Sequence, residues 1–281
     1  MVRVAVYRRV RVSEALVKSG LYDIDYALNP YAGCEHGCRY CYARAYTRYR
    51  EAAENWGQVV YIKENIVEVL EREVVRKKRG VVGVSTITDP YQPIERTESL
   101  TRACLEVLLR AGFQVSIQTK SDLVLRDLDL LSEHRDLVDV GFTITTMDRE
   151  VASVIEPGAP PPEARARALR EVVESGIETW VFLGPIMCGV NDSENSIRRV
   201  IELAAETGST LYYDYLRLRA GVAEALAELK SEYPHAARFA RRWWQSVEEN
   251  IRKLCSELGV KCVAAFPPRR ESLTLDRFFT R

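Results

Sequence analysis

Residues 29–44 of the chain read Asn-Pro-Tyr-Ala-Gly-Cys-Glu-His-Gly-Cys-Arg-Tyr-Cys-Tyr-Ala-Arg. Cys34, Cys38 and Cys41 stand in this run with the spacing C-x3-C-x2-C, on a loop punctuated by two glycines. Thiolates this close in the chain can converge on one metal centre. An all-thiolate iron–sulfur cubane normally takes four cysteines. A local set of three therefore indicates a [4Fe–4S] cluster with one iron open to another ligand.

Other interpretations of these thiols remain open. A structural zinc site of the Cys3His type could recruit His36 or a distant cysteine, although zinc sites usually present two separated ligand pairs. Three unrelated buried thiols fit poorly with a loop built from glycines and aromatic residues. A disulfide is disfavoured because seven cysteines in 281 residues, with no signal peptide, fit a reducing cytoplasmic compartment.

The composition sets broad limits on the class of protein. A length of 281 residues allows one large domain or two small ones, and a hydrophobic content of 47% supports a sizeable core. No apolar run reaches the roughly 18 residues that a membrane span needs, so no membrane is expected. The formal net charge of zero gives no global argument for nucleic acid. Abundant charge with scarce Asn and Gln is typical of a thermophile.

Strand-like runs alternate with amphipathic stretches along most of the chain. Apolar, β-branched runs predict strands at residues 24–28, 81–88, 115–119, 138–145, 179–185 and 210–218. Apolar spacings of three and four predict helices at 64–78, 100–111, 163–175 and 197–207. Such alternation implies right-handed βαβ units and a parallel sheet. Six units make an α/β fold of the partial (β/α)6 TIM-barrel type.

The pattern changes after residue 218. Helices are predicted at 221–232 and 235–258, a last strand at 260–266, and a polar tail from Pro267. We expect an N-terminal extension at 1–23, a core at 24–220, and a helical extension at 221–281 packed on that core.

Polar residues at the strand ends are candidates for the site, because active sites of such sheets lie at the carboxyl ends of the strands. Prolines after the second strand place Thr88 and Asp89 at the mouth. Lys120 ends the third strand and could neutralise a carboxylate. Thr143 and Thr145 share one face of the fourth strand. A plain turn, a solvated lysine and ordinary threonine β-propensity are the alternatives.

The cysteine run resembles the signature of the radical S-adenosylmethionine (SAM) superfamily, C-x3-C-x-aromatic-C. The resemblance implies a (β/α)6 core and a [4Fe–4S] cluster held by Cys34, Cys38 and Cys41. It also implies that the amino and carboxylate groups of S-adenosyl-L-methionine chelate the fourth iron. One electron then cleaves the cofactor to a 5′-deoxyadenosyl radical, which abstracts a hydrogen atom.

Further runs resemble one branch of the superfamily, the relatives of spore photoproduct lyase. These runs are residues 29–44, 88–95, 119–120, 142–146 and 156–158, with Arg165 downstream. The resemblance implies that Tyr40 and Tyr42 lie beside the cluster, and that Thr88, Lys120 and Thr143 contact the cofactor. Backbone near Gly184 would pack against adenine. Asp89, Thr145 and Glu156 complete the expected cofactor-binding set.

The chain departs from that branch at the hydrogen donor. The lyase has a donor cysteine two residues before its cofactor-binding serine, and Thr86 stands there in this chain. A hydroxyl hydrogen is much harder to abstract than a thiol hydrogen. Cys188, after the fifth strand, could supply the thiol or a ligand, or it could be a loop cysteine without a role. Cys255 and Cys262 lack a second cluster motif.

These features predict a radical SAM enzyme, a lyase or a transferase, acting on an unknown small molecule, peptide or nucleic acid. An electron donor such as ferredoxin or flavodoxin is an expected partner. A nucleic-acid lesion lyase or base-modifying enzyme is the alternative, and a non-catalytic zinc or iron–sulfur module is the alternative of another class. Two basic clusters favour nucleic acid: Arg72, Arg76, Lys77, Lys78 and Arg79, and Arg238, Arg241 and Arg242 beside two tryptophans. Substrate contacts are expected from Tyr91, Gln92, Glu95, Glu156, Tyr215 and Arg217.

Overall fold

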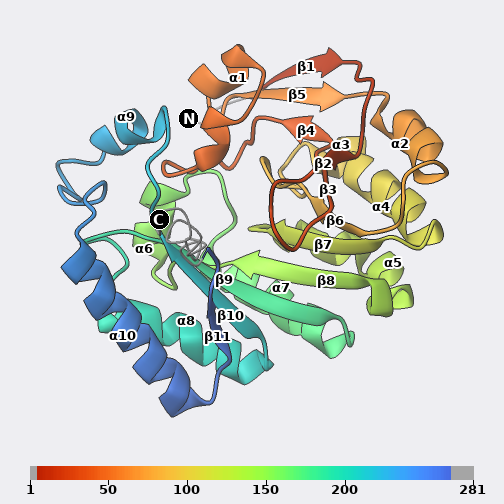
Figure 1. Ribbon diagram of the computed structural model, residues 1–281. Coiled ribbons are helices and arrows are strands. Elements are labelled where there is room, and N and C mark those ends of the chain that lie inside the picture. The colour runs from red at the N-terminus through yellow and green to blue at the C-terminus, as the bar shows by residue number, and fades with distance from the viewer. Residues whose placement is uncertain (1–4, 267–281) are drawn as a thin grey trace, which may run out of the picture.

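The structure, a computed structural model, describes residues 5–266 (Figure 1). Its main sheet has eight strands in the order β11-β10-β9-β8-β7-β6-β3-β2. The strands are β2 (Val17–Lys18), β3 (Tyr26–Leu28), β6 (Val81–Val84), β7 (Gln114–Thr119), β8 (Val138–Thr143), β9 (Glu178–Ile186), β10 (Thr210–Tyr215) and β11 (Cys262–Ala264). Every pairing is parallel except that of β2 with β3.

The predicted α/β fold with a parallel sheet is confirmed. The six predicted strands of the core correspond to β3, β6, β7, β8, β9 and β10, which are neighbours in chain order. β11 adds a parallel strand at one edge, and β2 closes the other edge. Within residues 5–266 these two edge strands do not pair, so the sheet is an open α/β arrangement with the strand order of a partial (β/α)6 barrel.

Helices follow the strands, as the periodicity predicts. The longer ones are α2 (Ile66–Val74), α4 (Leu100–Arg110), α7 (Pro162–Glu174), α8 (Glu194–Thr207) and α10 (Arg241–Leu258). Short helices complete the set: α1 (Arg50–Glu54), α3 (Glu95–Glu98), α5 (Leu128–Glu133), α6 (Arg149–Ile155), α9 (Val222–Ala227), and the 3-10 turns η1 (Tyr42–Ala45), η2 (Asp122–Asp127) and η3 (Arg135–Leu137). No helix in the described part of the chain is long and apolar enough to cross a membrane.

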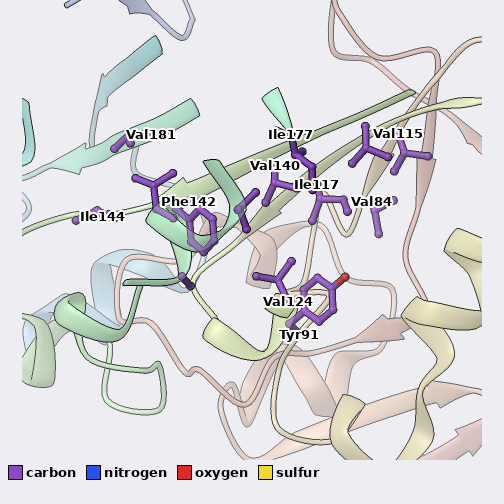
Figure 2. Packing of buried hydrophobic residues seen from close by; sticks show 14 of the residues in the cluster. Val84, Tyr91, Val115, Ile117, Val124, Val140, Phe142, Ile144, Ile177 and Val181 are labelled. Carbon is purple, nitrogen blue, oxygen red and sulfur yellow. The ribbon is translucent and has the colours of Figure 1, made fainter. Parts of the chain in front are cut away.

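The core lies between the sheet and these helices. Val84, Ile117 and Val140 are cross-strand neighbours on β6, β7 and β8, and all three are buried (Figure 2). Phe142 and Val181 form the next buried pair along β8 and β9. β-branched side chains that interlock across parallel strands stabilise this arrangement through burial of apolar area.

A small second sheet was not predicted. It has the order β1-β5-β4, from β1 (Val6–Val10), β5 (Val59–Lys63) and β4 (Tyr31–Ala32). β1 pairs in parallel with β5, and β4 pairs antiparallel with β5. β4 leads directly into the cysteine loop, so this sheet fixes where that loop begins.

Some element ends differ from the predictions. β6 ends at Val84 because Ser85 has a φ of 63°, a left-handed conformation that a strand cannot continue through. The two C-terminal helices are shorter than expected, as α9 and α10. Cys255 and Cys262 form a disulfide that joins α10 to β11. The polar tail from Pro267 lies outside the described residues.

Candidate metal and cofactor site

The three cysteines occupy the loop between β4 and η1. Cys34 and Cys38 are buried, and Cys41 is half-buried. Gly33 opens the loop with a φ of 85°, and a Cβ there would lie 2.3 Å from the Val59 carbonyl oxygen. The position therefore admits only glycine without rearrangement. A short backbone turn then reverses the chain between Cys38 and Cys41, since the Cys41 N–H donates a hydrogen bond to the Cys38 carbonyl oxygen at 3.3 Å.

The thiols lie close enough to influence one another. Burial raises the pKa of Cys34, and the negative charges of Asp89 and Cys38 raise it further. Burial also raises the pKa of Cys38 to about 12, whereas the Lys120 ammonium opposes that effect. Within residues 5–266 no group of three or more His, Cys, Asp or Glu side chains is arranged to bind a single metal ion. A [4Fe–4S] cubane does not require the three sulfurs to surround one ion, because each thiolate binds a different iron of the cluster.

Asp89 connects the cysteine loop to the third strand end. Its carboxylate accepts hydrogen bonds from Thr119 Oγ1 at 2.7 Å and from the Lys120 N–H at 2.9 Å. His36 Nδ1 lies 3.3 Å from Asp89 Oδ2, near enough for a charge contact but outside the angular range of a hydrogen bond. Burial raises the pKa of Asp89, but these partners outweigh it and lower that pKa to about 2. The carboxylate is thus fully engaged within the protein.

The turn after β6 is tied to the cysteine loop by hydroxyl and amide groups. Thr88 Oγ1 donates to the Gly33 carbonyl oxygen at 2.5 Å, and Gln92 Nε2 donates to Thr88 Oγ1 at 2.9 Å. Tyr42, which is 49% exposed, donates from its Oη to the Thr86 carbonyl oxygen at 2.5 Å. Thr88 and Gln92 therefore brace the loop in this structure.

Glu156 is the centre of a second buried network. It forms an ion pair with Arg165 over 2.5 Å between Oε2 and Nη2, and both side chains are 1% exposed. Thr145 Oγ1 donates to Glu156 Oε1 at 2.8 Å, and Tyr40 Oη donates to the same oxygen. The network fixes the aromatic residue of the C-x3-C-x-aromatic-C motif against the fourth strand end.

The last residue of the Glu156-Pro157-Gly158 run has to be glycine. A Cβ at this position would lie 2.2 Å from the Glu35 carbonyl oxygen, and the Gly158 N–H donates to the His36 carbonyl oxygen at 2.9 Å. The backbone of residues 156–158 thus lies directly against the cysteine loop.

Lys120 differs from the residues around it. Its side chain is half-buried, and its Nζ lies 5.7 Å from the centroid of the Tyr40 ring. Burial lowers the pKa of Lys120, but the Cys38 and Glu156 charges outweigh that and raise it. No carboxylate lies within ion-pair distance of this ammonium in the part of the chain that the structure describes. The group is a cation beside the cysteines with a free donor set.

The remaining strand-end residues gather near these networks. Thr143 is buried, and its Oγ1 accepts a hydrogen bond from Gln118 Nε2 at 3.0 Å. The Gly184 carbonyl oxygen accepts from Thr145 Oγ1 at 3.3 Å. Cys188 is half-buried just beyond β9, where its neighbour Met187 packs in one apolar cluster with Cys38 and Tyr40.

Three residues expected to contact the substrate, Tyr91, Gln92 and Glu95, are buried and contact other parts of the protein. Tyr91 belongs to the main core, where Figure 2 shows it beside Val124. Glu95 accepts from Tyr31 Oη at 2.5 Å and from Arg126 Nη2 at 2.7 Å. Gln92 is fully buried, as described above. These side chains support the loop and are not presented to a substrate.

Tyr215 and Arg217 belong to an exposed surface that we call the aromatic–arginine face. It consists of Tyr215, Arg217, Phe239, Trp243, Trp244 and Phe266. The Tyr215 ring lies 4.7 Å from that of Phe239, and the Arg217 guanidinium lies 4.4 Å from the Tyr215 ring centroid. Phe239 is 50% exposed and Phe266 is 45% exposed. The face stands at the carboxyl end of β10, on the rim of the mouth.

Five buried side-chain nitrogens around the cysteine loop have no hydrogen-bond partner among residues 5–266. They are His36 Nδ1, His36 Nε2, Arg39 Nε, Arg44 Nε and Trp56 Nε1. Buried N–H groups are rarely left unpaired. Sulfide and thiolate sulfur would satisfy them, so the donor set fits an anionic iron–sulfur cluster. Sequence patterns did not single out Trp56, because no motif or periodicity marks it.

Together, the strand order, the cysteine loop after β4 and the polar strand ends define a radical SAM enzyme. The chain belongs to the Radical SAM superfamily, whose family model matches residues 28–204. This membership favours an enzyme over a non-catalytic zinc or iron–sulfur module.

Relatives extend over most of the chain. An uncharacterized protein of Methanocaldococcus jannaschii is 33% identical over 211 residues, covering 75% of this chain and 77% of its own length. An uncharacterized protein of Mycobacterium tuberculosis is 29% identical and covers 92% of this chain and 83% of its own length. A mutant of spore photoproduct lyase has a similar fold, with a TM-score of 0.68, 16% identity, and coverage of 92% of this chain and 82% of its own. SuiB of Streptococcus suis, bound to S-adenosylmethionine, has a TM-score of 0.57, 9% identity, and coverage of 86% and 52%.

Proposed function

We propose that Cys34, Cys38 and Cys41 hold a [4Fe–4S] cluster and that the chain binds S-adenosyl-L-methionine beside it. When bound, the pair supplies reductive cleavage of the sulfonium and a 5′-deoxyadenosyl radical for hydrogen abstraction. The chain's own contribution is to fix three thiolates, to neutralise the cofactor's charge and to keep water from the mouth. The substrate remains to be found.

The unpaired Lys120 ammonium is the observation that carries this proposal. It stands at a strand's carboxyl end, beside Cys38 and over the Tyr40 ring. A half-buried cation without a carboxylate partner is a built receptor for an anion. The methionyl carboxylate of S-adenosyl-L-methionine is such an anion. A spore photoproduct lyase structure holds AdoMet on a similar fold, which supports the assignment.

The other cofactor contacts fall into two groups. Thr143 and the Gly184 backbone, with Tyr42 at the open side, are proposed to meet the cofactor directly. Tyr40, Thr88, Asp89, Thr145 and Glu156 are proposed to act by holding the loop, because their polar atoms join the loop to the strand ends or to one another.

Cys188 is proposed as the thiol hydrogen donor that Thr86 cannot be. Burial raises the pKa of Cys188, and nearby Asp192 raises it further, which keeps the S–H form at neutral pH. Asn191 holds this loop, since its Nδ2 donates to the Thr145 carbonyl oxygen at 2.8 Å. Loss of product in Cys188→Ala, with 5′-deoxyadenosine still formed, is the expected result. Unchanged product formation would remove Cys188 from the reaction.

Anaerobic reconstitution with iron and sulfide tests the cluster. The wild type is expected to turn brown and to bind four irons per chain at one cluster. Cys38→Ala is expected to lose the colour, whereas Cys104→Ala, which removes a buried thiol of the main core, is expected to keep it. A colourless protein holding one zinc would refute the proposal.

Nucleic acid is the second candidate substrate, favoured by the aromatic–arginine face. Exposed aromatic rings can stack bases, and the exposed Arg238, Arg241 and Arg242 beside the face can follow phosphates. The other basic cluster lies at the opposite end of the sheet, because Arg72 and Arg76 precede the start of β6. A spore photoproduct lyase structure is complexed with a dinucleoside photoproduct.

Anisotropy with a labelled single-stranded oligonucleotide separates the two clusters. Phe239→Ala is expected to weaken binding by about 1–3 kcal/mol, the usual value of one stacked base. The charge reversal Arg241→Glu is expected to weaken binding and its salt dependence, whereas Arg72→Glu is not. Absence of binding in the wild type at low salt would exclude nucleic acid.

A further inference from the structure

We propose that Trp56 donates a hydrogen bond from its indole N–H to the sulfur shell of the cluster and so raises the cluster's reduction potential. This inference rests on the proposed function, because it requires a cluster at Cys34, Cys38 and Cys41. It assigns to Trp56 a positioning and tuning role that the cysteine motif does not include.

Trp56 is packed on the cysteine loop. Its side chain is 5% exposed and forms one apolar cluster with Cys34 and Ala43, against which Cys41 also packs. The following residue, Gly57, has a φ of 87°, and a Cβ there would lie 2.9 Å from the Gly37 Cα. The chain at residues 56–57 therefore lies directly against the segment between the first two cysteines.

The indole has little freedom to turn away. The Arg44 guanidinium lies 5.9 Å from the ring centroid, a cation–π contact. The backbone on either side is held, since the Gln58 N–H donates to the Asn55 carbonyl oxygen at 2.9 Å. The ring is thus kept in the apolar cluster that includes Cys34 and borders Cys41.

The indole N–H needs an acceptor. It is buried, and no acceptor within residues 5–266 bonds to it. A buried unpaired donor costs about 1–3 kcal/mol. Metal-bound cysteines are thiolates, and thiolate or sulfide sulfur accepts N–H hydrogen bonds. Thiolate or sulfide sulfur at Cys34 or Cys41 is therefore the acceptor that we propose for this N–H, because both cysteines belong to or border the apolar cluster that holds the ring.

Such a bond acts on the redox equilibrium. A hydrogen bond to sulfur stabilises the reduced cluster more than the oxidised one, because reduction adds negative charge. Trp56→Phe keeps the ring and removes the N–H. Trp180→Phe is the matched control: Trp180 Nε1 donates to Asp139 Oδ1 at 2.6 Å, and Asp139 lies at the start of β8, away from the cysteine loop.

The experiment is a redox titration of reconstituted, cofactor-free protein with dithionite, followed by EPR of the reduced cluster. Trp56→Phe is expected to lower the one-electron reduction constant about threefold to tenfold, or about 30–60 mV at 59 mV per tenfold change. Trp180→Phe is expected to match the wild type. An unchanged potential in Trp56→Phe would overturn the inference.

A second readout looks for the hydrogen bond directly. With ¹⁵N-indole-labelled tryptophan, pulsed EPR of the reduced wild type is expected to show a nitrogen coupling that Trp180→Phe retains and Trp56→Phe loses. No coupling in a protein that does form the cluster would overturn the role of Trp56 alone. No cluster signal in the wild type would instead refute the proposed function.

Discussion

At the scale of residues, two buried carboxylates that bond to several partners hold the cysteine loop. Asp89 ties the loop to the end of β7, and Glu156 ties Tyr40 to the end of β8. Lys120 lies between them with its ammonium free. This division separates the residues that hold the loop from the residue that we propose binds the cofactor.

The free ammonium leads to a prediction for Lys120→Met, which keeps the length of the stem and removes the charge. Cluster content is expected to be unchanged, whereas S-adenosyl-L-methionine affinity falls by about 1–3 kcal/mol, the value of a charge-assisted hydrogen bond. Equilibrium dialysis with labelled cofactor measures it, and Lys78→Met in the exposed segment between α2 and β6 is the control. Equal affinity in Lys120→Met and wild type would remove Lys120 from the site.

Asp89 predicts a pH dependence of stability. Its pKa is lowered to about 2 in the fold, from a usual value near 3.8. Its stabilisation is therefore complete above about pH 5 and is lost as the pH falls towards 2. The loss amounts to about 2 kcal/mol at roughly 1.4 kcal/mol per pH unit.

Urea unfolding of wild type and Asp89→Asn at pH 6 and pH 3 measures this contribution. The stability advantage of the wild type is expected to shrink at pH 3. An advantage that stays constant between the two pH values would show that the Asp89 charge does not matter.

The residue types at the strand ends predicted where the candidate site lies, but they did not predict what each side chain contacts there. Lys120 and the cysteines could be identified from spacing and position alone. The engagement of Thr88, Gln92 and Glu95 within the protein could not, because it depends on contacts between distant loops. Trp56 was missed for the same reason: its packing in one cluster with Cys34 depends on the fold and leaves no pattern in the sequence.

At the scale of elements, the segment containing α9 covers the cysteine loop. Val222, Leu226 and Leu229 pack in one apolar cluster with Cys38 and Tyr40, and Glu228 forms an ion pair with Arg39. Figure 1 shows α9 standing apart from α8 and α10. The apolar side chains of α9 thus pack on the cysteine loop.

Leu226→Ala is expected to loosen this cover, because truncating a buried leucine costs about 2–5 kcal/mol. The brown colour of the reconstituted variant should fade faster in air than that of the wild type, and exchange of the amide hydrogens of residues 38–41 should speed up. Leu254→Ala, an equally buried truncation in α10, is the control. Equal fading in Leu226→Ala and wild type would show that α9 does not shield the loop.

Periodicity predicted the six core strands, because each strand is a continuous apolar run followed by an amphipathic helix. It missed β1, β4 and β5, since short strands outside the main sheet lack that context. It overextended β6, where the left-handed Ser85 ends the strand although its neighbours have high β-propensity.

At the scale of the whole molecule, the disulfide between Cys255 and Cys262 is an unexpected staple. It joins the end of α10 to the edge strand β11 across a sequence separation of 7. Closing so short a loop is worth about 2–3 kcal/mol on the chain-entropy estimate. The thermophilic character suggested by the composition stays a prediction.

The double variant Cys255→Ser, Cys262→Ser is expected to unfold at a lower temperature than the wild type without losing cluster content. Differential scanning calorimetry measures the shift, and dithiothreitol should lower the wild-type transition but not that of the variant. A wild-type transition that does not respond to the reductant would contradict the staple.

The central claim is that this chain uses its cysteine loop to cleave S-adenosyl-L-methionine. Reconstituted protein, reduced anaerobically with dithionite, should convert the cofactor to 5′-deoxyadenosine, measured by liquid chromatography and mass spectrometry. Formation is predicted to require dithionite and to vanish in Cys38→Ala. A wild-type protein that carries its full cluster and binds the cofactor, yet forms no 5′-deoxyadenosine, would contradict the account.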